Sequence, residues 1–526
     1  MNKKYKLSRI INEYGADPRE LCDLKEAREM IERVNIYHKL KDSEDTIDSI
    51  TWNDLEMDEI FHLVNHTRSY AGEQVLYHIL HGTDIQKREK IDKEADFFDQ
   101  NEDERIRTES ELMDVGKGYL NYYNPDVIDG LEDLKIGSAS GFLILLAAFI
   151  LSVIATVINP TFLALPIIIG VINIFVYMVF KLRHEIELYS LGSIRELIIF
   201  CGKLMKSEQL SEMYIDEKKK ESIIRLHRLT SVLEMYRQRS IMQDSGNPLS
   251  LIFEYLLGIT LFDAICCSIV LKKLQKYRSE ILELYELTGW VDTVISVASF
   301  RRSLDTCKPE IKDDGYIECE QIYHPLLKNP VKNDIDLKRN CFFTGANATG
   351  KSTFMKAMAI NVILGETIFT CTADKMTFPD MYVMTSMALR DDVLMGESYY
   401  VREIKYLKRM LETADSGKKT MIVIDEILKG TNTKERIASS RAVLDYLSDK
   451  NAIVIAATHD MELVEKMETK YDAYYFDCDV EDGEVKFNYV LHQGKNETTN
   501  AIMLMKGMGF PDKVIEDALE YNVEEE

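Results

Sequence analysis

The last third of the chain alternates short apolar runs with longer helical segments. Residues 341–344, 420–424 and 452–457 are mostly apolar runs of strand length, and Phe354–Leu364 has the composition of a helix. Short buried strands that alternate with helices are typical of a parallel sheet with helices on its faces. The pattern predicts an α/β domain in this part of the chain.

Residues 141–180 have a different pattern, because none of these forty positions carries a charge. Phe142–Ile158 is apolar almost without interruption, Asn159-Pro160-Thr161 breaks the run, and Phe162–Phe180 resumes it. Each half approaches the roughly 17–25 residues that cross a bilayer as a helix. Its apolar positions cover all sides, which excludes an amphipathic surface helix. We predict a transmembrane helical hairpin; the alternative is a hairpin buried inside a large core.

Charges beside the hairpin predict its orientation. Two spans joined by a short turn return the chain to the side from which it started. Lys135 precedes the hairpin, and Lys181, Arg183 and His184 follow it, so the positive-inside rule places both flanks in the cytoplasm. The prediction is a multi-pass membrane protein of two spans, with both termini and the α/β domain in the cytoplasm.

A third apolar stretch, Leu251–Leu271, is interrupted by Glu254 and Asp263. An acid at the middle of a bilayer is costly, so we interpret this stretch as a core helix. A further membrane segment is the alternative. The adjacent cysteines Cys266 and Cys267 do not have the spacing of a metal site.

A glycine-rich loop follows the first predicted strand. Gly345, four residues, and then Gly350-Lys351-Ser352 reproduce the spacing of a phosphate-binding loop, in the strand–loop–helix context that this motif requires. Backbone N–H groups and the positive end of the helix would face a triphosphate. Lys351 would reach the β- and γ-phosphates, and Ser352 would hold Mg²⁺. The predicted ATP contacts in this loop are Gly345, Asn347, Thr349, Gly350, Lys351, Ser352 and Thr353.

Two carboxylates, Asp425 and Glu426, end the second predicted strand. A buried strand needs no acids, so a pair at its carboxyl end indicates chemistry. We predict that Asp425 joins Ser352 as a Mg²⁺ ligand and that Glu426 deprotonates or orients the attacking water. His459 follows the third strand and would sense the γ-phosphate; a structural role is the alternative for this histidine. The predicted catalytic residues are Lys351, Glu426 and His459.

The segments around these residues resemble the MutS family of DNA mismatch-repair proteins. Asp391–Ser398, followed by Glu403, is similar to that family's D-D-L-x-x-G-x-S segment. Asp425–Thr433 is similar to its D-E-I-x-x-G-T-x-T segment. The phosphate loop departs from the family's G-P-N-M-x-G-K-S-T at Ala346 and Ala348, which changes the rigidity of the loop but no phosphate contact.

Shorter signatures extend the resemblance to about residues 316–522. His324-Pro325 and Asn333-Asp334 stand where the family has H-P and N-D, and Gly509-Phe510-Pro511 resembles its G-L-P before the closing helices. In combination these motifs are highly specific. The resemblance implies a Mg²⁺-dependent, ATP-hydrolysing domain.

A weaker resemblance to the family's helical core domain lies upstream, in Thr51–Leu76 and Leu287–Ala298. Only about 48 residues precede it, so we expect no mismatch-reading or connector domain. The predicted fold class is α plus α/β, with the hairpin inserted in a helical core, or lever, domain. The expected parts are an N-terminal helical segment (1–48), the two parts of the core domain (49–136 and 183–305), the hairpin (137–182) and the phosphate-loop ATPase domain with C-terminal dimerisation helices (306–526).

The resemblance also implies a dimer, because the family's D-D-L-x-x-G-x-S segment helps to complete the nucleotide site of the partner. Gly396 and Ser398 would then act in trans on the ATP of a second copy. The expected assembly is a homodimer with four membrane helices.

Charge and cysteine content limit the partners. The chain has 64 basic and 88 acidic residues and a net charge of −24, which opposes non-specific DNA binding because phosphate neutralisation supplies most of that affinity. The most basic stretch, 218–239, is diluted by neighbouring acids, and we interpret it as a solvated helix face rather than a DNA groove. The charged first twenty residues do not form a cleavable signal peptide, and the nine cysteines have no C-x-x-C spacing, which fits a reducing compartment.

Three functional classes follow. The first is a membrane-anchored, dimeric ATP-driven switch of the MutS type with a role on DNA. The second is a membrane-bound ATPase that acts on an unknown protein or lipid partner without DNA, which the acidic charge favours. The third, a transporter, is disfavoured because residues 141–180 contain no ionisable side chain to mark a substrate path.

Overall fold

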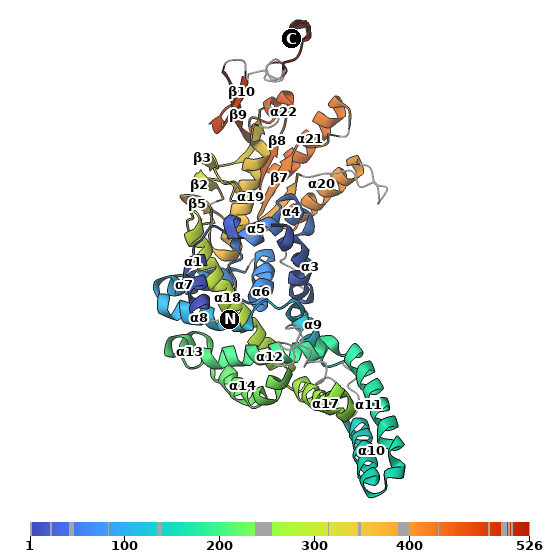
Figure 1. Ribbon diagram of the computed structural model, residues 1–526. Helices are drawn as coiled ribbons and strands as arrows, with labels where there is room; N and C mark the ends of the chain where they lie inside the picture. The colour runs from blue at the N-terminus through green and yellow to red at the C-terminus, as the bar shows by residue number, and fades with distance from the viewer. Residues whose placement is uncertain are drawn as a thin grey trace.

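The structure of the protein is a computed structural model. Its description covers all residues except 1–2, 22–23, 42–46, 83, 134–138, 237–254, 314, 346–348, 388–398, 430, 482–483, 496–501, 503–504, 506–508 and 525–526. The molecule is elongated, with an α/β domain at one end, a helical body in the middle and a two-helix hairpin at the other end (Figure 1). The predicted combination of helical and α/β parts is confirmed, whereas the boundaries between the parts stay predictions.

The helical body combines segments from both sides of the hairpin. Its longest helix, α18 (Arg278–Ser303), packs on α6 (Tyr70–His81) and is buried along most of its length. The other helices of the body are α1 Lys3–Glu13, α2 Pro18–Leu21, α3 Leu24–Leu40, α4 Ser49–Asp54, α5 Met57–Val64, α7 Ile85–Gln100, α8 Glu102–Val115, η1 Tyr119–Tyr123, α9 Asn124–Asp129, α12 Glu185–Leu204, α13 Glu208–Tyr214, α14 Glu217–His227 and α17 Phe262–Gln275.

Two glycines allow α6 and α18 to approach closely. A Cβ atom on Gly289 would lie 2.4 Å from Val75 Cγ2, and one on Gly72 would lie 2.2 Å from Asp292 Oδ2. Asp292 is fully buried and accepts hydrogen bonds from the backbone N–H groups of Arg68 and Ser69 at the start of α6. Burial raises the pKa of this carboxyl to about 6. The two segments that resemble a core domain are thus in direct contact.

The α/β domain contains a six-stranded sheet of order β10-β9-β4-β8-β7-β6, in which only β10 is antiparallel to its neighbour. The three predicted strands are β4 (Asn340–Thr344), β7 (Thr420–Asp425) and β8 (Ala452–Ala457). They are adjacent and parallel, so their carboxyl ends meet at one edge. The other elements of this layer are α19 Lys351–Ile368, β6 Tyr382–Ser386, α20 Tyr399–Asp415, α21 Thr433–Ser448, α22 Met461–Lys466, β9 Tyr471–Glu481, β10 Glu484–Gln493 and α24 Asp512–Glu524.

A second, smaller sheet has the order β1-β5-β2-β3 and lies beside the helical body (Figure 1). Its strands are β1 Glu310–Ile311, β2 Ile317–Ile322, β3 Asn333–Leu337 and β5 Lys375–Phe378. The loop between β2 and β3 carries His324-Pro325, and β3 begins at Asn333. These two family-like signatures therefore lie on the same side of the domain.

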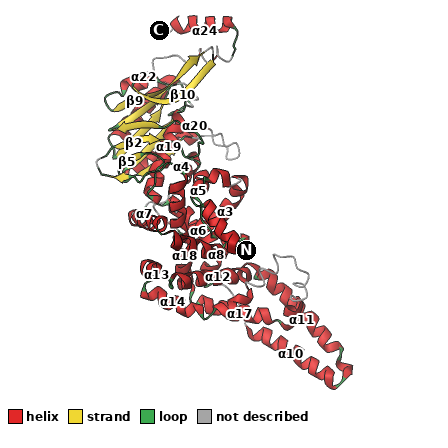
Figure 2. Cartoon of the chain, turned by 60° about the vertical axis from the view of Figure 1, so that its left-hand side comes forward, coloured by secondary structure: helices red, strands yellow, loops and turns green. Residues whose placement is uncertain are grey.

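The hairpin consists of α10 (Ala139–Ile158) and α11 (Ala164–Arg183), joined by the short 3-10 helix η2 (Pro160–Phe162). Both helices are long and apolar enough to cross a membrane. Of the most apolar 18 residues, only 6 % are buried in Ala139–Ile158 and 17 % in Pro160–Arg183. Figure 2 shows the hairpin extending away from the helical body. Within the described part of the chain, the rest of the protein leaves most of the hairpin uncovered, unlike a helix pair inside a core.

Polar contacts join the helical body to the α/β domain. Arg88 on α7 pairs with the buried Glu366 of α19 and, at 3.0 Å, with Asp380. Asp54 on α4 accepts hydrogen bonds from Thr385 Oγ1 (2.7 Å) and from the Met387 backbone N–H (2.9 Å) at the end of β6. The body is thus tied to the helix that follows the glycine-rich loop and to the strand end that precedes residues 388–398.

Candidate nucleotide site

The glycine-rich loop connects β4 to α19, as predicted. Gly345 and Gly350 have φ values of 124° and 105°, which are strained for any other residue. Lys351 is the first residue of α19, and its Nζ donates a 2.6 Å hydrogen bond to the Gly345 carbonyl. Burial lowers the pKa of this lysine. An ammonium group held over the loop beside a helix N-terminus can attract a phosphate.

A hydroxyl and a carboxylate meet next to Lys351. Ser352 Oγ donates a 2.6 Å hydrogen bond to Asp425 Oδ2, across the gap between α19 and β7. Hydroxyl and carboxylate oxygens are the donors that Mg²⁺ prefers. Ser352 and Asp425 were predicted as a metal pair from separate motifs, and the structure brings them together. Their donor set fits the predicted ion.

Glu426 has two cationic or potentially cationic neighbours. Its Oε2 lies 2.9 Å from Lys429 Nζ, and its Oε1 lies 3.4 Å from His459 Nε2. The hydrogen bond with His459, followed by that with Lys429, lowers the pKa of the carboxyl to about 2 despite partial burial. The backbone of Glu426 is left-handed, with φ 59°, and its N–H donates to Ala457 O at the end of β8. The strand end therefore presents Glu426 as a carboxylate beside His459.

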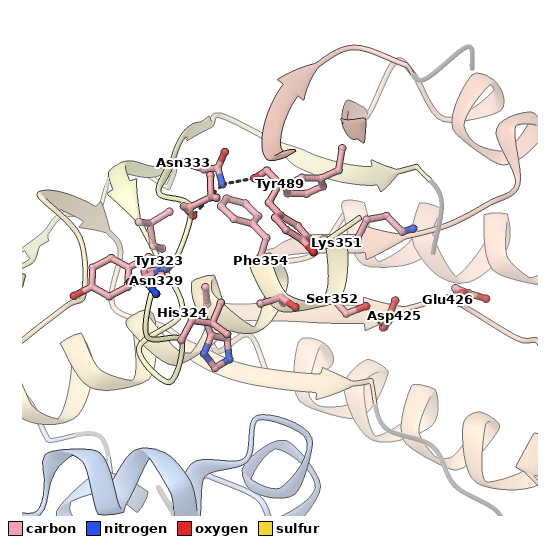
Figure 3. A pocket seen from close by; sticks show the side chains of 18 of the residues that line it. Tyr323, His324, Asn329, Asn333, Lys351, Ser352, Phe354, Asp425, Glu426 and Tyr489 are labelled. Carbon is pink, nitrogen blue, oxygen red and sulfur yellow. Dashed lines mark hydrogen bonds between the residues drawn. The ribbon is translucent and has the colours of Figure 1, made fainter. Parts of the chain in front are cut away.

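A cavity of about 700 Å³ joins these groups to the loop between β2 and β3. Figure 3 shows Lys351, Ser352, Asp425 and Glu426 along one part of it and Tyr323, His324 and Asn329 at another. Thr353 also lines this cavity, and Thr349 is buried beside Gly345. The cavity is large enough for a nucleotide by the size range of ligand sites, about 300–1,000 Å³.

Tyr489 is a cavity residue that the sequence did not reveal. It lies in a bulge of β10 with a φ of 56°, and its ring covers Gly350, where an added Cβ would be 3.1 Å from Tyr489 Cδ1. Asn333 holds this bulge: its Nδ2 donates to Tyr489 O (3.0 Å), and its Oδ1 accepts from the Leu491 N–H (2.8 Å). Figure 3 shows the Asn333 contact. A tyrosine in an ordinary strand pattern gave no sequence signal, because the bulge is set by distant contacts.

Three predicted site residues, Asn347, Gly396 and Ser398, lie outside the described residues. Glu403, which follows that segment, is buried on α20, and its Oε1 accepts a 3.1 Å hydrogen bond from the Lys429 N–H. Glu403 thus fixes the backbone that carries Lys429 beside Glu426.

The basic stretch on α14 is neutralised by nearby acids. Lys218 pairs with Glu283 at 2.6 Å and Arg225 with Glu280 at 3.6 Å, both across to α18. Lys219 and Lys220 pair with the acids just before them. In the described residues this stretch matches the predicted solvated face; Arg237 and Arg239 lie outside them.

Comparisons with known proteins agree with the geometry of the site. Residues 341–525 match the family model described as MutS domain V. The endonuclease MutS2 of Carboxydothermus hydrogenoformans is 30 % identical over 264 residues, which cover 47 % of this chain and 32 % of that protein. The DNA mismatch repair protein MutS of Leuconostoc mesenteroides is 28 % identical over 279 residues (50 % of this chain, 31 % of that protein), and that of Fusobacterium nucleatum is 32 % identical over 254 residues (45 % and 28 %). The matched part of the chain spans about a third of the length of these relatives.

Proposed function

We propose that the site around Lys351 binds and hydrolyses ATP and that hydrolysis drives a conformational switch. The chain belongs to the MutS family through its domain V. The observation that carries the proposal is the 2.6 Å contact between Ser352 and Asp425, which pairs the two predicted metal ligands beside the phosphate loop. Two motifs seventy-three residues apart meet where the chemistry needs them.

Each side chain of the site has a distinct role in the proposed hydrolysis. When ATP binds, Lys351 exchanges its hydrogen bond with the Gly345 carbonyl for an ion pair with the phosphates. This exchange is favourable because a hydrogen bond between two charged groups is stronger than one to a neutral carbonyl. Ser352 and Asp425 hold Mg²⁺, which when bound neutralises charge on the phosphoryl group. Glu426, a carboxylate at neutral pH, orients the attacking water or takes its proton. His459 supports Glu426 from the other side and reads the γ-phosphate.

The switch would reach the helical body through contacts that lie behind the site. Glu366, near the end of α19, pairs with Arg88, so a shift of the helix that begins at Lys351 would move α7. Asp54 holds the end of β6 next to residues 388–398, which include Gly396 and Ser398. We propose that these two residues complete the ATP site of a second copy, so that ATP closes a homodimer and hydrolysis reopens it.

The proposed location of the switch is a membrane. The support is the uncovered pair α10 and α11, in which residues 141–180 carry no charged side chain. Both termini and the ATPase domain would then lie in the cytoplasm, where ATP is available. A homodimer would place four hairpin helices in the bilayer. The part boundaries stay as predicted from the sequence, with 137–182 as the membrane part.

Two classes of partner remain under this proposal. The family likeness favours a role on DNA related to mismatch repair. The net charge of −24, and the ion pairs that neutralise Lys218 and Arg225, favour a protein or lipid partner instead. A DNA role would need a local basic groove that phosphate contacts could use.

Hydrolysis and DNA binding can be tested on the same preparation. The purified full chain in detergent should hydrolyse ATP with Mg²⁺, and the Lys351→Ala variant should lose ATP binding. A duplex that stimulates hydrolysis and binds with a steep salt dependence supports the DNA role. ATP hydrolysis without any salt-dependent duplex binding supports the second class. Wild-type protein that does not bind ATP contradicts the proposal.

A further inference from the structure

The segment from Tyr255 to Leu271 packs against the base of the hairpin. Residues 255–260 are helical, Leu261 turns with a φ of 52°, and α17 continues from Phe262. Leu257, Leu261 and Ile265 form a buried cluster with Tyr177 of α11. Phe142, Leu145 and Leu146 of α10 pack against this cluster. Figures 1 and 2 both show α17 beside the hairpin helices, at the end where they join the body. One apolar side of this segment therefore packs on the hairpin, whereas Ala264, Cys267 and Val270 join the core of the helical body.

Polar groups fix the register of this contact. Asn173, a fully buried polar side chain of α11, donates through Nδ2 a 2.8 Å hydrogen bond to the Ile259 carbonyl. One turn further along α11, Tyr177 OH lies 3.3 Å from Asp263 Oδ2, and a Cβ atom on Gly258 would make a tight 3.1 Å contact with Tyr177 Cδ1. Ile259 precedes the left-handed Leu261, where the helix is interrupted and carbonyls need other partners. Non-helical backbone at membrane depth is tolerated only where protein covers it, and Asn173 provides that cover.

The contact with Asn173 sets a depth. Lys181 is the first charged residue after Asn173 on α11, eight positions further on. At about 1.5 Å of rise per residue this separates them by about 12 Å along the helix axis. The hydrocarbon layer is about 30 Å thick. If Lys181 lies at the cytoplasmic boundary, the Ile259 carbonyl is well inside the layer of acyl chains.

The outer face of the segment is suited to that layer. Tyr255, Leu256 and Phe262 are 60 %, 56 % and 49 % exposed, close to the values for hairpin residues such as Leu151 (66 %). Asp263 is the only charged residue between Tyr255 and Leu271, and it is buried against Tyr177. The next charges, Lys272 and Lys273, lie at the other end of α17. The exposed surface of the hairpin thus continues onto this segment without a charged side chain.

We infer that residues 255–269 re-enter the bilayer from the side where the hairpin begins and ends, and that Tyr255, Leu256 and Phe262 face lipid acyl chains. This inference rests on the proposed membrane location of α10 and α11. The predicted core helix is confirmed for the side of α17 that carries Ala264, Cys267 and Val270, which belong to the core of the helical body. The inference adds a membrane contact for the side that faces the hairpin and lipid. Glu254 lies outside the described residues.

Quenching by lipids with brominated acyl chains tests the inference. The full chain is reconstituted in phosphatidylcholine vesicles as three variants: Leu256→Trp, Leu151→Trp in the hairpin, and Tyr446→Trp, whose side chain is exposed on α21 of the ATPase domain. The native tryptophans, Trp52 and Trp290, lie in the helical body and give a constant background. Each variant must retain wild-type ATP hydrolysis, which shows that it is folded.

The expected result is that brominated lipid quenches the same fraction of the emission from the added tryptophan in Leu256→Trp and in Leu151→Trp. The emission of Tyr446→Trp should stay unchanged. Bromine near the carbonyl end of the acyl chain should quench Leu256→Trp more than bromine near the terminal methyl group. Quenching of Leu151→Trp without quenching of Leu256→Trp overturns the re-entrant segment but keeps the hairpin in the membrane. No quenching of either variant overturns the membrane proposal itself. Crosslinking between copies at position 256 without quenching would assign this face to a second copy and also overturn the inference.

Discussion

Replacing Glu426 by glutamine should separate ATP hydrolysis from ATP binding. Glutamine keeps the size of the side chain but cannot take a proton from water. A positioned general base contributes about 10²–10⁴-fold to a rate, which equals about 2.7–5.4 kcal/mol of barrier. We therefore expect turnover to fall by about 10²-fold or more, while the affinity for ATP stays close to that of the wild type. Glu426 touches Lys429 and His459 rather than the phosphate loop, which is why binding should survive.

The loss of stability in this variant should be small by comparison. The Glu426 side chain is 25 % exposed, and its partners Lys429 and His459 are both 42 % exposed. Ion pairs with such solvent exposure contribute about 0–1 kcal/mol each. A variant that still folds and binds ATP therefore reports on chemistry. Lys429→Gln removes one partner of the carboxylate but no group of the proposed reaction, so its turnover should change by less than about tenfold.

The assay is single-turnover hydrolysis of labelled ATP, combined with equilibrium binding of a fluorescent ATP analogue. Glu462→Gln is a matched control, because Glu462 is an exposed glutamate of α22 that pairs with Lys466. Equal turnover in wild type and Glu426→Gln would refute the role of Glu426 as base. Loss of binding together with turnover would instead make it part of the nucleotide-binding surface, and the reasoning from geometry would be wrong.

Three further predictions concern the dimer, the membrane and acid stability. Ser398→Ala and Lys351→Ala chains should partly restore hydrolysis when mixed, because one site of the mixed dimer keeps an intact loop and an intact trans segment; turnover that stays linear in protein down to monomer concentrations would contradict this. Wild-type protein should resist carbonate extraction, and deletion of residues 138–182 should release soluble protein that still binds ATP. The double substitution Leu146→Arg and Ile168→Arg should block membrane insertion, because each charge costs about 2.5–3.5 kcal/mol at a helix centre. Wild-type protein in the detergent-free soluble fraction would refute the membrane location. Burial lowers the pKa of His81 to about 3, whereas the pKa in the unfolded chain is about 6.5. The neutral side chain therefore contributes fully to the free energy of unfolding above about pH 6.5, and this contribution is lost as the pH falls toward about 3. At pH 5 the loss is about 2 kcal/mol. The thermal midpoint should therefore drop between pH 7 and pH 5, less so in His81→Gln, and identical drops in both proteins would exclude this histidine as the cause.

Local sequence determined the elements of the site. The strands β4, β7 and β8 begin and end within one residue or two of the apolar runs that predicted them, because each run is a complete strand with turn residues on both sides. The spacing from Gly345 to Ser352 fixes which groups face a phosphate, since these contacts come from one short loop. The uncharged stretch 141–180 likewise determined two helices, because length and composition alone are enough to define such a pair.

Tertiary structure decided which side chains meet. Lys429, Tyr489 and Asn333 join the cavity from three separate elements. Asn333 belongs to a family-like signature, but no local pattern shows that its side chain holds Tyr489, and Tyr489 itself resembles an ordinary strand residue. The same is true of Asp54 and Arg88, which tie the helical body to the α/β domain through residues about 280–330 positions away.

The segment Tyr255–Leu271 is the clearest case. Its composition favours a core helix, because an acid in lipid is costly, but Asp263 is costly there only when nothing covers it. The contacts of Asn173 with Ile259 and of Tyr177 with Asp263 supply that cover and place the segment against the hairpin. The two residues of each of these contacts lie eighty-six positions apart in the sequence. Only the folded chain therefore shows which side chain is the partner of which.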